Sequence, residues 1–175
     1  MMDDARVVGL AQSGELERFA LLYDRYADKI YRFVYYRLRH KETAEDVTSD
    51  VFYKAMDKIS SYDSTKGSFS SWLYRIAYNT LVDYTRRQRP TINIDDIPEI
   101  ADESDLTNDM NKRLDAKRLH KALEVLPDDQ KDIIKMRVWD ELSYKQIAEV
   151  IGKNEGSAKM MFHRAIKLLA AKLEQ

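Results

Sequence analysis

The sequence predicts an all-α protein with two small helical domains joined by a flexible acidic linker. Apolar residues recur at helical spacing over long stretches, and the 175 residues include only 5 Gly and 3 Pro. One segment near the middle, PTINIDDIPEIADESDLTND, is acidic and has no sustained period. A chain of this length forms one medium domain or two small ones. We therefore expect domains at residues 1–89 and 111–175, with the linker at 90–110.

Composition excludes several classes of function. The chain has no cysteine, so it has no disulfide framework and no thiolate metal site, and its 3 His are isolated in the sequence. We expect no catalytic residue, no metal and no cofactor. There is no signal peptide and no long apolar run, which predicts a cytoplasmic protein without direct membrane insertion. The formal net charge of −1 is unusual for a simple DNA-binding domain and predicts weak DNA affinity for the isolated chain.

Two helices are expected in the first sixty residues. The first, at 15–39, is rich in aromatic residues and has a possible break near Ala27. The second, at 42–59, has Thr43 or a neighbour as its N-cap and an acidic outer face. On that face Asp46 and Asp50 are like charges at i and i+4, which weakly indicates a basic partner.

A third helix is expected at 70–87, after a polar loop. Its outer side combines tyrosines, arginines and an amide: Tyr74, Arg75, Tyr78, Asn79, Asp83, Arg86 and Arg87. Rings and cations in this mixture suit single-stranded DNA, where bases stack on aromatic groups and phosphates pair with arginine. A cationic helix end with peripheral tyrosines is the alternative interpretation.

The C-terminal domain is expected to contain a helix-turn-helix at residues 141–169. Ser143 and Gln146 have the spacing of a capping box, and Gly152 is suited to the left-handed turn that ends a helix. Asn154 can cap the second helix, whose apolar positions recur at helical spacing. Before this motif, Pro127 opens another helix, and Trp139 is expected in the core.

The outer side of the second helix carries several hydrogen-bond donors and little negative charge, which suits the major groove of DNA. An ordinary helical hairpin with a solvated basic side is the alternative.

Three stretches resemble the extracytoplasmic-function (ECF) group of bacterial RNA polymerase sigma factors. AEDVTSDVF resembles the family's helix that docks on the clamp coiled coil of core polymerase. FSSWLYRIAYNTLVDYTRR resembles its promoter-melting segment, and the stretch from LPDDQ to KLL resembles the domain that reads the minus-thirty-five element. The order of the three around an acidic linker is far more specific than any one of them.

The resemblance implies an alternative sigma factor that binds core RNA polymerase through its clamp coiled coil and flap, binds promoter DNA, and has an anti-sigma factor. The implied polymerase-binding residues are Glu45, Asp46, Ser49, Asp50 and Tyr53. The implied minus-ten residues are Tyr62, Asp63, Lys66, Tyr78, Asn79, Asp83, Arg86 and Arg87. The implied minus-thirty-five residues are Ser157, Lys159, Met160, His163, Arg164 and Lys167.

Two other functions compete with this one. A conventional helix-turn-helix regulator would use the N-terminal helices for dimerisation or ligand binding, but it has no need of the tyrosine–arginine helix. An enzyme such as a nuclease would need acidic residues grouped with His or Cys at metal-binding spacing, and the sequence has no such group.

Overall fold

The computed structural model describes residues 3–88, 118–119 and 121–173, and for Gln88 only the backbone. The described residues form helices and no strand, which confirms the all-α prediction. The elements in chain order are α1 (Asp4–Gln12), η1 (Leu16–Arg18), α2 (Phe19–Leu38), α3 (Lys41–Asp57), η2 (Ile59–Ser61), α4 (Phe69–Gln88), α6 (Asp128–Val138), α7 (Tyr144–Ile151) and α8 (Glu155–Leu173). The predicted linker at 90–110 lies outside the described residues.

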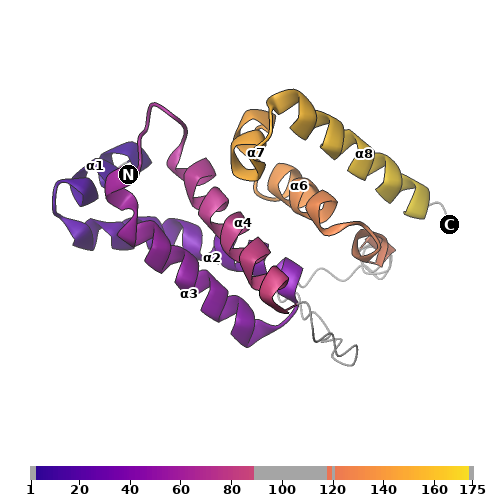
Figure 1. The fold of residues 1–175 in the computed structure, drawn as a ribbon, viewed down its shortest axis with the longest axis horizontal. Coiled ribbons are helices and arrows are strands. Elements are labelled where there is room, and N and C mark those ends of the chain that lie inside the picture. Colours follow the sequence, from indigo (N-terminus) through magenta and orange to yellow (C-terminus); the bar gives the residue numbers. More distant parts are fainter. Residues whose placement is uncertain (1–2, 89–117, 120, 174–175) are drawn as a thin grey trace, which may run out of the picture.

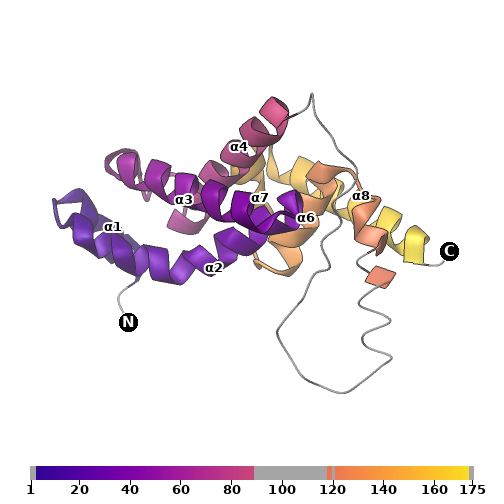
Figure 2. The same ribbon diagram turned by 90° about the horizontal axis from the view of Figure 1, so that it is seen from below.

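The N-terminal half is a bundle of α2, α3 and α4, with α1 at the end farthest from α8 (Figures 1 and 2). Leu22 and Ile30 of α2, Val51 of α3 and Leu73 of α4 are fully buried at its centre. The buried residues of each helix recur at helical spacing, as Ile30, Phe33 and Val34 do on α2, so each helix turns one apolar stripe inward. Edge-to-face aromatic pairs, such as Tyr23 with Phe52, complete the packing.

The C-terminal half consists of α6, α7 and α8, preceded by a helical turn at 121–124. Ile134 of α6 packs with Ala165 and Leu169 of α8. Small alanines on α8 let the neighbouring helices approach closely, and Ala158 is completely buried.

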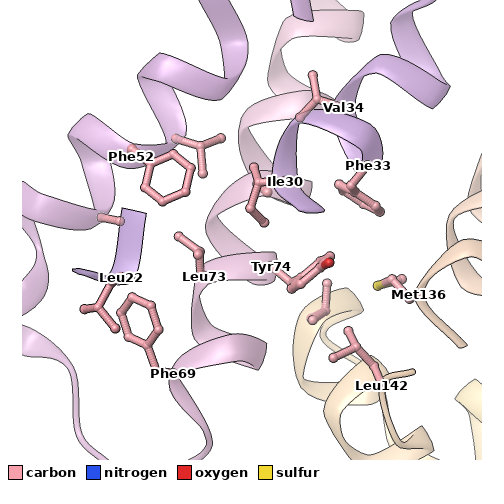
Figure 3. Close-up of a cluster of buried hydrophobic side chains, with 14 of the residues drawn as sticks. Leu22, Ile30, Phe33, Val34, Phe52, Phe69, Leu73, Tyr74, Met136 and Leu142 are labelled. Carbon is pink, nitrogen blue, oxygen red and sulfur yellow. The ribbon is translucent and has the colours of Figure 1, made fainter. Parts of the chain in front are cut away.

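The two halves share one apolar core, because α7 packs along α4 and α6 packs against α2. Figure 3 shows Tyr74 of α4 between Phe33 of α2 and the C-terminal residues Met136 and Leu142. Tyr74 is 1% exposed, although the sequence predicted it on the outer side of its helix, so that prediction was wrong. Burial, and then the nearby Asp140 carboxylate, raises the pKa of its hydroxyl.

Polar contacts accompany this apolar boundary. Arg37 of α2 donates to the Asp132 carboxylate of α6, and a second contact of 3.3 Å joins its guanidinium to Asp128. At the other end of the boundary, the Ser71 hydroxyl donates to Glu149 Oε2 at 2.8 Å. The Gln146 amide donates to Ser68 Oγ at 3.0 Å. The halves are therefore joined at both ends of the interface.

Several local predictions needed correction. Helix α2 runs without a break through Ala27, and α3 is capped by His40, whose ring nitrogen accepts from the Thr43 amide at 3.3 Å. Trp139 is 49% exposed instead of buried in the core. It ends α6 beside Tyr36, where its ring is only partly covered.

Candidate nucleic-acid interface

The helix-turn-helix is formed by α7 and α8, and its caps are those that the sequence predicted. Ser143 Oγ accepts from the Gln146 amide at 3.2 Å, and Gln146 Oε1 accepts from the Ser143 amide at 2.9 Å, so the capping box is complete. Gly152 ends α7 with φ 67°, a conformation that disfavours a side chain. Asn154 Oδ1 then accepts from the Ser157 amide at 2.7 Å and starts α8.

The solvent side of α8 carries the predicted minus-thirty-five residues. The long side chains among them are exposed, and they lie opposite the buried alanines of the same helix: Lys159, Met160, His163, Arg164 and Lys167. Ser157 is half-buried beside the helix start. The centre of the His163 ring lies 6.5 Å from that of the Tyr144 ring of α7, so His163 neighbours both helices of the motif. The hydrogen-bond donors among these side chains are therefore open to solvent.

The predicted minus-ten residues divide between α4 and the loop at 61–67. On α4, Asn79, Arg86 and Arg87 are exposed, while Asp83 is half-buried with an ion pair of 3.3 Å to Arg86. Tyr78 is half-buried near α6, and burial, followed by the Asp132 charge, raises its pKa. Part of the outward face of α4 is therefore exposed to solvent, whereas Tyr78 in the middle of the helix is partly covered by the C-terminal half.

The loop at 61–67 is held in one shape by its own side chains. Asp63 Oδ1 accepts from both the Thr65 amide at 2.9 Å and the Thr65 hydroxyl at 2.7 Å, and these bonds lower the pKa of Asp63. Lys66 is exposed and lies 3.4 Å from Asp63. Tyr62 is buried, and its hydroxyl donates to the Gly67 carbonyl at 3.0 Å. Tyr62 therefore packs beneath the loop as part of the core, and its side chain does not lie on the loop surface.

The acidic face of α3 is open to solvent. All five predicted polymerase-binding residues are exposed: Glu45, Asp46, Ser49, Asp50 and Tyr53. Asp50 forms an ion pair of 2.7 Å with Lys54, whereas Glu45 and Asp46 have no such pair among the described residues. This face retains unbalanced negative charge.

An apolar groove of about 350 Å³ lies beside the acidic face, and the sequence analysis missed it. Residues of η1, α2 and α3 line it: Leu16, Glu17, Phe19, Ala20, Tyr23, Phe52, Tyr53 and Met56. Tyr53, which is 67% exposed, belongs to both surfaces. The sequence feature that could have predicted the groove is the set of apolar residues on α2 and α3 that lie outside the buried stripes of these helices.

Two family models match the chain, one in its N-terminal half and the other in its C-terminal half. Sigma-70 region 2 matches residues 22–91, which include α3 and α4, and Sigma-70 region 4 matches residues 116–169, which include the helix-turn-helix. Sequence relatives include the ECF RNA polymerase sigma factor SigW of Bacillus subtilis, 31% identical over 93% of this chain and 92% of SigW. The chain belongs to the ECF family of RNA polymerase sigma factors. Sigma factors are transcription initiation factors, so family membership gives this chain the function of an alternative sigma factor.

Other relatives agree with this assignment. The ECF sigma factor BldN of Streptomyces coelicolor is 34% identical over 96% of this chain, and the chain spans 66% of the length of BldN. Among solved structures, CnrH in complex with the cytosolic domain of CnrY has a TM-score of 0.73 at 21% identity, covering 98% of this chain and 97% of CnrH. Sigma factor RpoE from Bartonella quintana, solved in complex with the anti-sigma factor NepR, has a TM-score of 0.71 at 24% identity, covering 89% and 96%. These two structures share the fold of this ECF chain.

Within residues 3–88, 118–119 and 121–173, no three His, Asp or Glu side chains are grouped so that they could hold a metal ion. None of the helices in those ranges is long and apolar enough to cross a membrane.

Proposed function

We propose that this sigma factor uses three separate surfaces to start transcription. The acidic face of α3, with the adjacent groove, docks on the clamp coiled coil of core RNA polymerase. The loop at 61–67 and the outer face of α4 hold the melted minus-ten element, and α8 reads the minus-thirty-five element. The domains at 1–89 and 111–175, with the linker at 90–110, are part of this proposal.

One observation carries the proposal: an exposed recognition helix lies on the same chain as an exposed acidic helix. A sigma factor that meets DNA while bound to polymerase need not be basic overall, which accounts for the net charge of −1. The experiment is reconstitution. The chain is added to core polymerase, and transcription from a promoter library is sequenced. No promoter-specific transcript above the level of core polymerase alone would contradict the proposal.

An anti-sigma factor is the second proposed partner. The acidic face and the apolar groove next to it offer a protein partner both charge and apolar area. A factor bound there would compete with polymerase for the same residues. Competition between the purified factor and core polymerase for the chain tests this, and simultaneous binding of both would contradict it.

Two basic residues of α8 should have different effects on promoter recognition. Arg164 has a planar fork that matches guanine, so Arg164→Ala should cost about 1–3 kcal/mol at the cognate promoter and relax specificity at one base pair. Lys159 is nearer the helix start and suits a phosphate, so Lys159→Ala should weaken all promoters alike and lower the salt slope by about one unit. Binding of each variant with core polymerase to single-base-substituted promoters, at several salt concentrations, measures both effects. A uniform loss from Arg164→Ala would contradict its role.

Met160 can be tested in the same assay. If Met160 contacts a thymine methyl group, Met160→Ser should change preference at that base pair and leave the salt slope unchanged. An unchanged preference would exclude that contact.

A further inference from the structure

Helix α1 lies before the match to Sigma-70 region 2, which begins at residue 22, and no role for it was predicted from the sequence. It is nevertheless firmly seated, because Val7 and Val8 are fully buried and Ala11 nearly so. Near its first turn, the Asp4 carboxylate accepts from Arg25 at 2.6 Å and from the Tyr26 hydroxyl. Because α1 is fixed in this way, its C-terminal end can hold a neighbouring segment of backbone in place.

The other end of α1 touches the start of the loop at 61–67. Gln12, the last residue of α1, donates from Nε2 to the Ile59 carbonyl at 2.9 Å and to the Tyr62 carbonyl at 2.8 Å. An amide nitrogen carries two hydrogens, so both of its donors are used. The two carbonyls lie at the start of η2 and immediately after its end, where the chain leaves the α3 helix and enters the loop.

Tyr62 connects Gln12 to the far end of the loop. Its carbonyl is held by Gln12, and its hydroxyl donates to the Gly67 carbonyl at the far end of the loop. Its ring packs 5.8 Å from Phe69 and 5.4 Å from Trp72, at the start of α4. A continuous series of contacts therefore runs from α1 through Tyr62 to both ends of the loop.

We propose that Gln12 is a positioning residue for the minus-ten loop, and this inference rests on the proposed function of that loop. Gln12 fixes the backbone at Tyr62 so that the loop is already shaped to receive an unpaired base. Preorganisation matters there because a loop ordered only on binding loses affinity to its ordering entropy. The side chain of Gln12 is exposed, so replacing it opens no cavity in the core.

The test compares two substitutions of similar size. Gln12→Glu keeps the shape but presents oxygens to two carbonyls, whereas Gln12→Lys retains donors that can reach them. We expect Gln12→Glu to form open complexes about tenfold more slowly, since two hydrogen bonds are lost, and Gln12→Lys to restore most of the rate. Gln12→Glu should also discriminate less between promoters that differ at single bases of the minus-ten element, an effect that a loss of stability alone would not produce.

Hydrogen exchange supplies a readout that does not depend on activity. In the free protein, amides of residues 61–67 should exchange faster in Gln12→Glu than in wild type or Gln12→Lys. Ser13→Ala is the matched control, because it removes the Ser13 hydroxyl bond to the Leu10 carbonyl at the same helix end without touching the loop. It should behave as wild type in both assays. If Gln12→Glu does not fold, Gln12→Ala replaces it in the same comparison.

The outcomes separate this inference from the proposed function. Wild-type rate, base discrimination and loop exchange in Gln12→Glu would overturn the role of Gln12 while leaving the sigma-factor function intact. Failure of the wild-type chain to form an open complex at any promoter would remove both.

Discussion

Asp132→Ala is expected to separate the two halves of the molecule, at a cost of about 3–5 kcal/mol to the closed arrangement. The Asp132 side chain is 3% exposed, and it is paired with Arg37, which is 11% exposed. Removing the Asp132 side chain takes away the buried acceptor of this guanidinium, and among the described residues it leaves the exposed Asp128 as the ion-pair partner of Arg37. Since the chain has no cysteine, spin labels can be placed at Glu42→Cys and Ala170→Cys, and the distance between them should lengthen in the variant.

Two variants serve as controls for this result. Asp132→Asn keeps an oxygen that can accept from Arg37, so it should open the molecule less than alanine does. Asp28→Ala breaks the exposed ion pair with Arg32 at 2.9 Å on the surface of α2, and it should cost well under about 1 kcal/mol. An unchanged label distance and an unchanged unfolding transition in Asp132→Ala would show that the buried pair does not hold the halves together.

The closed arrangement has a consequence for promoter binding. Elements centred near minus ten and minus thirty-five are about 25 base pairs apart, roughly 85 Å along B-form DNA. Helices α4 and α8, each about 30 Å long or less, belong to one body joined through α7. A chain that reads both elements at once must therefore adopt a more open arrangement than this one.

The stability of the closed form should depend on pH through Asp132. Burial raises the pKa of Asp132 to about 7, with Arg37 acting in the opposite direction and Asp128 and Asp129 adding to the rise. An acid whose folded pKa exceeds its unfolded value binds its proton more tightly when folded. Its contribution to stability is therefore largest in acid and declines as the pH rises from about 4 to about 7. Urea unfolding across this window should show the decline in wild type and a smaller one in Asp132→Asn.

The sequence predicted best what depends on neighbouring residues. The capping box of Ser143 with Gln146, the turn at Gly152 and the cap at Asn154 each use residues at most three apart, and all three are present. Exposure of the acidic side of α3 also followed from helical spacing alone.

The errors arose where distant parts of the chain meet. Tyr74 packs edge-to-face on Phe33 at the boundary of its own bundle, and its other side meets the C-terminal residues Met136 and Leu142, which are distant in the sequence. Trp139 was predicted in the core, yet it lies at the end of α6 and is 49% exposed. Helix α1 has a short and weak apolar pattern, so its anchoring of the loop through Gln12 was not visible before the fold was known.

Reversing two charges on α3 should weaken polymerase binding severely. In Asp46→Lys/Asp50→Lys, two exposed carboxylates on one face become ammonium groups. The new ammonium group at position 50 also replaces the present Asp50–Lys54 ion pair with two like charges. A basic partner surface would then meet positive charge, and we expect core affinity to fall by about 100-fold or more. Neither side chain is buried, so circular dichroism should remain that of the wild type.

Helix α2 supplies a matched control for this charge reversal. Asp24 and Asp28 are also exposed and one turn apart, and Asp28 pairs with Arg32 just as Asp50 pairs with Lys54. They lie on the side of α2 away from its buried residues Leu22 and Ile30. Asp24→Lys/Asp28→Lys makes the same change in net charge, so it separates a local docking surface from general electrostatic attraction. Fluorescence titration with core polymerase at two salt concentrations should give near-normal affinity for the α2 variant and severe loss for the α3 variant. Equal losses in both would mean that net charge, and not the face of α3, governs docking.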